Sequence, residues 1–374
     1  LTHTPDSDES HPQWSADGRS IAFLSDRKRG AEQADDETKT QVWLMPADGG
    51  EARQVTDLPS GVEDFVWSPD GTQLAVIAFD PEQPPGAKKP KNSPPIVTDR
   101  FQFKDDDSGW LGRRHKHLHI VDVASGKATL LTPGVHDEQL PAWSPDGKLI
   151  AYVTKRGADP DRHLNYDIYV IAPHAGAQER QLTRFPGSDL DPYWETRPAW
   201  SPDSTRIAYL QGGEDKWIYY APWQLAVIDV ASGRTTLPAP IDRCFTKVRW
   251  SPDGRSVYAL VEQRQVTQLS RIDLRSGKVS GLTHGDRFDV DLDVSANGRI
   301  VVLGGDDTHP YALAAVERDR LRALDDHNGW LRDKHLAPAE LLHFRSADGT
   351  ALDALLVKPL DYVPGQRYPT IVRI

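Results

Sequence analysis

The chain has 374 residues, with 44 lysines and arginines against 55 aspartates and glutamates, and a formal net charge of −11 at pH 7. This acidic balance argues against general affinity for nucleic acid or anionic lipid, and no apolar run approaches the ~20 residues of a membrane-spanning helix. From the charge and the lack of an apolar run we expect a soluble protein with no nucleic-acid or membrane partner. The single cysteine, Cys244, excludes an intrachain disulfide, and cysteine usage therefore leaves both a cytoplasmic and a periplasmic location open.

A short pattern, Trp-Ser-Pro-Asp-Gly followed by an apolar run, recurs along the chain with some variation. The copies begin at Trp14, Trp67, Trp143, Trp200, Trp250 and Val294. Proline, aspartate and glycine in this order favour a tight turn, and apolar residues on both sides predict two paired strands. The copies therefore indicate one structural unit that is repeated.

Two further strands are predicted in each unit. The third strands are expected at residues 42–44, 119–121, 168–170, 225–227, 269–272 and 312–316. The fourth strand is short and closes the unit with an apolar–threonine pair, which begins at Val55, Leu131, Leu182 and Leu282. Four antiparallel strands at this spacing are typical of a propeller blade. We predict an all-β fold, a β-propeller with six visible four-stranded blades, and burial of the five repeat tryptophans between neighbouring blades.

The first two residues, Leu1 and Thr2, repeat the apolar–threonine pair that ends other units. Two interpretations are open. The pair is the end of a blade whose other strands are missing, which implies seven blades in the full protein, or it closes a six-bladed ring.

The second unit carries an insertion from Asp80 to about Arg114 that begins with a proline-rich segment. Such a loop is expected to be a solvated excursion, with a partner-facing or pore-rimming role as the alternative. His115, His117 and His119 then alternate, so on a strand they share one face, and imidazoles suit zinc or copper. Because no carboxylate or cysteine stands close in sequence, we predict a basic face on an exposed strand and no metal site.

The loop before the fourth unit, residues 185–197, is rich in acidic and aromatic side chains, which are the types that bind ligands. Loops that enter the innermost strand lie near one mouth of a propeller channel, where a carboxylate can bind a peptide amino terminus. The candidate substrate-binding residues are Asp191, Tyr193, Trp194, Glu195 and Arg197. The alternative is that Tyr193 and Trp194 pack this loop on a neighbouring blade.

The repeat stops after Leu321, and residues 341–359 predict a new hairpin followed by a buried strand at 368–374. The segments Phe344–Gly349, Lys358–Pro359 and Tyr368–Val372 resemble the junction of the prolyl oligopeptidase family of serine peptidases, in which a propeller precedes an α/β-hydrolase domain. The resemblance implies a propeller at 1–325 and, at 326–374, a linker and the first strands of a truncated hydrolase domain.

The resemblance, especially to acylaminoacyl-peptidase and dipeptidyl-peptidase-like members, implies the substrate-selecting propeller of an enzyme that cleaves short peptides without a cofactor, and a homo-oligomer is compatible with it. The family's His-Gly-Gly stretch and its Gly-x-Ser-x-Gly elbow do not occur in this sequence. No catalytic residue is therefore predicted, and the chain alone is expected to be inactive. The alternative is a free-standing TolB-like propeller that binds a protein partner. We also expect exposed apolar residues in the last segment, at Leu355, Leu356, Val357, Ile371 and Val372.

Overall fold

A computed structural model describes most of the chain. The described residues are 7–28, 39–81, 95–106, 109–191, 196–217, 220–318 and 320–373. These ranges contain three short 3-10 helices, η1 (Pro160–Arg162), η2 (Asp215–Trp217) and η3 (Gly329–Asp333). No helix in these ranges has the length and apolar character needed to cross a bilayer.

Four separate antiparallel sheets of four strands come first. The first sheet consists of β1 (Glu9–Trp14), β2 (Ser20–Ser25), β3 (Gln41–Pro46) and β4 (Arg53–Gln54). The second consists of β5 (Asp64–Trp67), β6 (Gln73–Phe79), β9 (Lys116–Asp122) and β10 (Ala128–Leu130). The third consists of β11 (Glu138–Trp143), β12 (Ile150–Thr154), β13 (Asp167–Ile171) and β14 (Arg180–Gln181). The fourth consists of β15 (Ala199–Trp200), β16 (Arg206–Gln211), β17 (Gln224–Asp229) and β18 (Thr235–Thr236).

The next eight strands form one sheet made of two antiparallel groups. The first group is β19 (Phe245–Trp250), β20 (Ser256–Gln263), β21 (Val266–Asp273) and β22 (Val279–Gly281). The second is β23 (Phe288–Val294), β24 (Ile300–Gly305), β25 (Ala312–Glu317) and β26 (Arg320–Ala323). A parallel bridge between Thr267 and Phe288 joins the groups. Two small hairpins stand apart, β7 (Lys104–Asp105) with β8 (Gly109–Trp110), and β27 (Ala339–Arg345) with β28 (Ala351–Val357).

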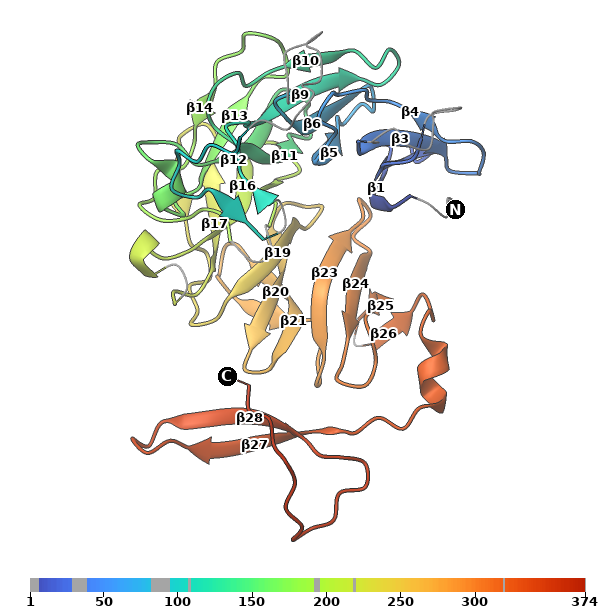
Figure 1. Ribbon diagram of the computed structural model, residues 1–374, viewed down its shortest axis with the longest axis vertical. Helices are drawn as coiled ribbons and strands as arrows, with labels where there is room; N and C mark the ends of the chain where they lie inside the picture. The colour runs from blue at the N-terminus through green and yellow to red at the C-terminus, as the bar shows by residue number, and fades with distance from the viewer. Residues whose placement is uncertain are drawn as a thin grey trace.

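The sheets follow one another around a common centre (Figure 1). Apolar clusters fill the space between successive sheets, for example Leu74 and Val76 of the second sheet against Ala22 and Leu24 of the first. This is the arrangement of a β-propeller. The all-β prediction is confirmed, and the expected third strands all lie within the third strands of the structure. The number of blades in the whole propeller stays a prediction.

The repeated turn owes its stability to a serine–aspartate pair. The Ser68 hydroxyl donates to Asp70 at 2.6 Å, and Ser251 donates to Asp253 at the same distance. Gly71 follows with φ near +72°, in the left-handed region that glycine adopts without strain. The hydroxyl of Ser144 and the Lys148 side chain lower the pKa of Asp146 to about 2. The turn is thus built from a carboxylate that remains ionised.

The repeat tryptophans connect neighbouring sheets, with one exception. The indole Nε1 of Trp200 donates to the Ala142 carbonyl of the third sheet at 2.9 Å, and that of Trp250 donates to the Ala199 carbonyl at 2.7 Å. Both are buried, and Trp67 and Trp143 are half-buried. The prediction is wrong for Trp14, which is 60% exposed. Trp14 belongs to the first sheet, and no earlier strand among the described residues covers it.

The apolar–threonine pairs lie just beyond the fourth strands and not within them. β4 ends at Gln54, one residue before Val55. The hydroxyl of Thr56 accepts the backbone N–H of Val42 at 2.8 Å, near the start of the third strand. Thr132, Thr183 and Thr283 accept equivalent bonds from their own third strands. The threonine therefore satisfies a buried N–H where the sheet ladder ends.

The last segment lies apart from the sheets, where hairpin β27–β28 follows η3 (Figure 1). Leu355 is 49% exposed, Val357 62%, Ile371 96% and Val372 79%, as expected, whereas Leu356 is half-buried. The predicted strand at 368–374 does not form within residues 368–373. A strand needs a neighbour for its backbone groups, and among the described residues this segment has no such partner strand.

Candidate functional site

One face of the propeller carries several of the longer loops of the second, third and fourth sheets. Because the strands of each sheet alternate in direction, the loop that enters the first strand and the loop between the second and third strands emerge at the same end. The described parts of the loops at 80–115, 133–137, 155–166 and 185–197 therefore share one face, here called the long-loop face.

A cavity of about 520 Å³ opens on this face where the loops of the second and third sheets meet. Its walls include Phe79 and Trp110 from the second sheet and its insertion, and Lys155 and Tyr166 from the third sheet. This volume lies within the range of small-molecule sites. We call it the inter-sheet pocket.

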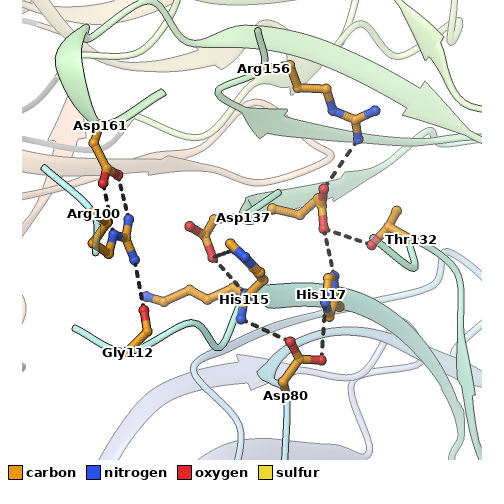
Figure 2. A network of polar contacts seen from close by, with 11 residues as sticks. Asp80, Arg100, Gly112, His115, His117, Thr132, Asp137, Arg156 and Asp161 are labelled. Atoms are coloured by element: carbon orange, nitrogen blue, oxygen red, sulfur yellow. Dashed lines mark hydrogen bonds and ion pairs between the residues drawn. The ribbon is translucent and has the colours of Figure 1, made fainter. Parts of the chain in front are cut away.

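The described part of the insertion is anchored to the third sheet through Arg100, while most of its residues are exposed, as the prediction of a solvated excursion expects. The Arg100 guanidinium donates to both carboxylate oxygens of Asp161, from Nε at 2.9 Å and from Nη2 at 2.5 Å. It also donates to the Gly112 carbonyl at 3.1 Å (Figure 2). These bonds lower the pKa of Asp161. The proline-rich residues 82–94 lie outside the described residues.

His117 sits between two carboxylates in the contact between the second and third sheets (Figure 2). Its Nδ1 lies 3.3 Å from Glu138 Oε2 and its Nε2 lies 3.3 Å from Asp80 Oδ1. Glu138 is also buried, and it accepts from Thr132 at 2.9 Å and from Arg156 at 3.3 Å. The prediction of a basic face on an exposed strand is therefore wrong, because β9 lies inside its sheet and His117 is only 4% exposed.

The alternate histidines differ in their electrostatics and do not act as a set. Burial alone lowers the pKa of His117, but Glu138 and Asp80 outweigh it, so its pKa is raised. Burial lowers the pKa of His119, whose Nδ1 lies 3.1 Å from the His117 carbonyl. Within the described ranges, no group of three or more His, Cys, Asp or Glu side chains has a geometry that could hold a metal ion.

Comparison with known proteins points to peptidases. No model of a known protein family matches the sequence. The "Uncharacterized peptidase YuxL" of Bacillus subtilis is 33% identical over 164 residues, 43% of this chain and 24% of that protein. Dipeptidyl-peptidase 5 of Porphyromonas gingivalis is 28% identical over 401 aligned residues, 98% of this chain and 54% of that protein. The chain thus spans 54% of this longer relative.

Solved structures show the same fold. An acylaminoacyl peptidase in complex with Z-Gly-Gly-Phe-chloromethyl ketone has a TM-score of 0.72 at 19% identity, over 97% of this chain and 52% of that one. The β-propeller domain of the Trilobed protease from Pyrococcus furiosus has a TM-score of 0.57 at 15% identity, over 86% and 84%.

This chain is related to peptidases of the prolyl oligopeptidase family. The resemblance predicted from the sequence is thereby confirmed.

In this peptidase-related propeller, the candidate loop before the fourth sheet is only partly described. Tyr193, Trp194 and Glu195 lie outside the described residues. Asp191 is 1% exposed and accepts the Thr196 backbone N–H at 3.0 Å. Its role in substrate binding, like that of the other four candidates, stays a prediction.

Arg197 connects three sheets of the propeller. Its Nη2 lies 2.8 and 2.9 Å from the two carboxylate oxygens of Asp64 on β5, and its Nη1 donates to the Pro141 carbonyl on β11. Arg197 itself enters β15 of the fourth sheet. These contacts give the guanidinium a clear structural role at the inner edge of the long-loop face.

Sequence reasoning missed Glu138 and the carboxylate that matches it in a later unit. Asp289 accepts from Thr283 at 2.5 Å, as Glu138 accepts from Thr132. In both cases the acid stands six residues after the threonine of the apolar–threonine pair. That spacing is the signal in the sequence from which a buried acid was predictable.

Proposed function

We propose that this chain is the substrate-selecting propeller of a serine-type oligopeptidase, similar to acylaminoacyl- or dipeptidyl-peptidases, that cleaves short peptides. Residues 1–325 form the propeller, and residues 326–374 form a linker and the first strands of an α/β-hydrolase domain. The observation that carries the proposal is the match to Dipeptidyl-peptidase 5 over 98% of this chain but only 54% of that protein. A match of this kind supports the proposal, because the relative is a longer protein named as a peptidase.

The propeller acts on substrates by selection and not by chemistry. Peptide hydrolysis needs a nucleophile, a base within hydrogen-bond reach and donors for the oxyanion, and the serine motif of the family does not occur in this sequence. The ring of sheets admits short peptides and excludes folded proteins by size. The long-loop face supplies polar and aromatic side chains that contact them.

A labelling experiment tests this proposal. The 374-residue chain, and a longer protein in which it is joined to a complete hydrolase domain as the proposal requires, are each incubated with a fluorophosphonate serine probe and with chromogenic dipeptide amides. We expect labelling and turnover for the longer protein only. Absence of both from the longer protein would refute the proposal and leave the protein-binding propeller as the better explanation. Labelling of a serine in the 374-residue chain would refute the assignment of chemistry to the hydrolase part.

A further inference from the structure

Three units of the propeller carry a buried acid at the same place, six residues after the threonine of the apolar–threonine pair. These acids are Glu138, Asp189 and Asp289, which are 2%, 1% and 0% exposed. Arg156 Nη2 lies 3.3 Å from Glu138, and Arg287 Nη2 lies 2.6 Å from Asp289. Among the described residues, Asp189 makes no ion pair. It is therefore the acid of this set whose charge would be least compensated.

Few hydrogen-bond donors face the Asp189 carboxyl group. Its Oδ1 accepts from Gln211 Nε2 at 3.1 Å, whereas its Oδ2 has no hydrogen-bond partner within the described part of the chain. The threonine of its own unit, Thr183, donates to Asp167 Oδ1 at 3.2 Å and not, as in the other two units, to the acid six residues later. Burial raises the pKa of Asp189 to about 7, against the contacts with Thr183 and Gln211 that lower it. A buried carboxyl group with so few donors favours its neutral form.

The other ionisable groups around Asp189 do not compensate its charge. Asp167 on β13 is a second buried acid, so its charge makes the ionisation of Asp189 less favourable. Burial raises the pKa of Tyr209 on β16, which is therefore neutral near pH 7. Arg184 is exposed, and its charge acts on Asp167. Glu214, whose backbone pairs with the loop that contains Asp189, is a further acid.

Asp189 lies in segment 185–191, which leads into the loop of the candidate substrate-binding residues and is held by backbone bonds on two sides. The Asp189 N–H donates to the carbonyl of Tyr166, just before β13, at 2.8 Å. The N–H of Gly212, just after β16, donates to the Ser188 carbonyl at 2.8 Å. Because the Asp189 carboxyl group is buried in the same contact, a movement that hydrates this group must also loosen these bonds.

We propose that the carboxyl group of Asp189 is a pH-dependent latch for segment 185–191. When it is protonated, it stays buried beside Gln211, and the segment remains held between the residues before β13 and after β16. When it is ionised, the carboxylate is more stable in water, so the segment opens. Asp189 is thus a positioning residue that acts through the segment and does not touch a substrate. Its effect on the candidate residues that follow rests on the proposed function, whereas the latch rests on these contacts alone.

The direction of the pH dependence follows from the two states of the segment. In the open state the carboxyl group titrates near the ordinary pKa of an aspartate, about 3.9. In the closed state its pKa is about 7. The ratio of open to closed molecules therefore rises by up to about tenfold for each pH unit between these two values and is constant above them. The latch is tightest in acid.

Hydrogen exchange followed by mass spectrometry on the 374-residue chain tests the latch. The Gly212 amide is the main reporter, because its N–H donates across the contact to segment 185–191. After correction for the intrinsic exchange rate, we expect its protection to fall by about tenfold or more between pH 5 and pH 7. The decrease should level off above pH ~8, where the closed state has lost its proton as well.

The decisive variant is Asp189→Asn, which keeps the shape of the protonated acid and cannot ionise. We expect the Gly212 amide of this variant to be equally protected at pH 5 and pH 7, and its melting temperature relative to the unchanged chain to rise with pH. Asp289→Asn is the matched control, because it removes a buried acid at the same position of another unit, where a guanidinium compensates the charge. In the control, the pH dependence at Gly212 should persist.

Equal protection of Gly212 at pH 5 and pH 7 in the unchanged chain would overturn the latch, and this measurement needs no variant. A pH dependence that survives in Asp189→Asn would also overturn it, as would its loss in both variants, since the effect would then not belong to this acid. None of these readouts involves turnover. A failure of the latch is therefore distinct from a failure of the proposed peptidase function, which the labelling and hydrolysis of the longer protein decide.

Discussion

The burial of Trp200 between neighbouring sheets predicts a large loss of stability when this residue is replaced. This tryptophan is 8% exposed, packs in the cluster between the third and fourth sheets, and donates to the Ala142 carbonyl. An indole buries about 150–250 Å², which at about 25 cal/mol per Å² gives an upper bound of about 4–6 kcal/mol. We expect Trp200→Ala to lower the free energy of unfolding by about 3–5 kcal/mol.

Two companion variants separate the causes. Trp200→Phe keeps an aromatic ring and loses the hydrogen bond, so we expect a smaller loss of about 1–2 kcal/mol. Trp14→Ala is the control, because Trp14 opens the same motif but is 60% exposed, and its replacement is expected to change stability by about 0.5 kcal/mol or less. Guanidinium unfolding followed by circular dichroism measures all three. Equal losses for Trp200→Ala and Trp14→Ala would refute the assignment of the tryptophan to the inter-sheet contact.

Three further predictions concern charged residues. Arg197→Ala leaves Asp64, whose side chain is 15% exposed, without its bound guanidinium, so we expect a loss of about 1–3 kcal/mol in unfolding free energy. Arg322, which pairs with Glu317 at the surface, is the control: Arg322→Ala should cost at most about 1 kcal/mol, and similar losses for the two variants would contradict this. Because the folded-state pKa of His117 is raised above its ordinary value of 6.5, the stability that His117 contributes is complete below pH ~6.5 and is lost as the pH rises through the folded pKa. The melting temperature of His117→Gln should therefore fall less over this pH range than that of the original protein, and identical pH profiles would exclude the contribution of His117. In the longer protein, Glu195→Gln should raise KM more for substrates with free amino termini than for blocked ones, and equal kinetics on both would remove Glu195 from the site.

The fold was largely predictable because its information is local and repeated. The Trp-Ser-Pro-Asp-Gly turn needs only neighbouring residues, such as the bond from Ser251 to Asp253 at 2.6 Å. Even the unit that lacks the glycine keeps the turn, since Ser204 adopts φ near +60°. The exposure of Trp14 was not predictable in the same way, because the burial of a repeat residue depends on the sheet that packs against it.

The candidate site was much less predictable. Asp80, His117 and Glu138 are separated by 37 and 21 positions in the sequence, and the Arg100–Asp161 pair by 61. No spacing rule joins residues so far apart. The alternation of His115, His117 and His119 is compatible with a metal-binding face or a basic face. In the structure, His117 is instead a buried imidazole between two carboxylates.

The two ends of each inter-sheet contact have different consequences for function. At the turn end, five of the six units begin with a tryptophan and all six carry a related turn, so contacts such as that of Trp200 specify packing and leave little room for variation. At the long-loop end, the units differ in loop length, and the insertion held by Arg100 and Asp161 contributes to the wall of the pocket between the second and third sheets. On the proposed function, we therefore expect substrate selection to depend on the loops, where the units differ most, and not on the repeated turns.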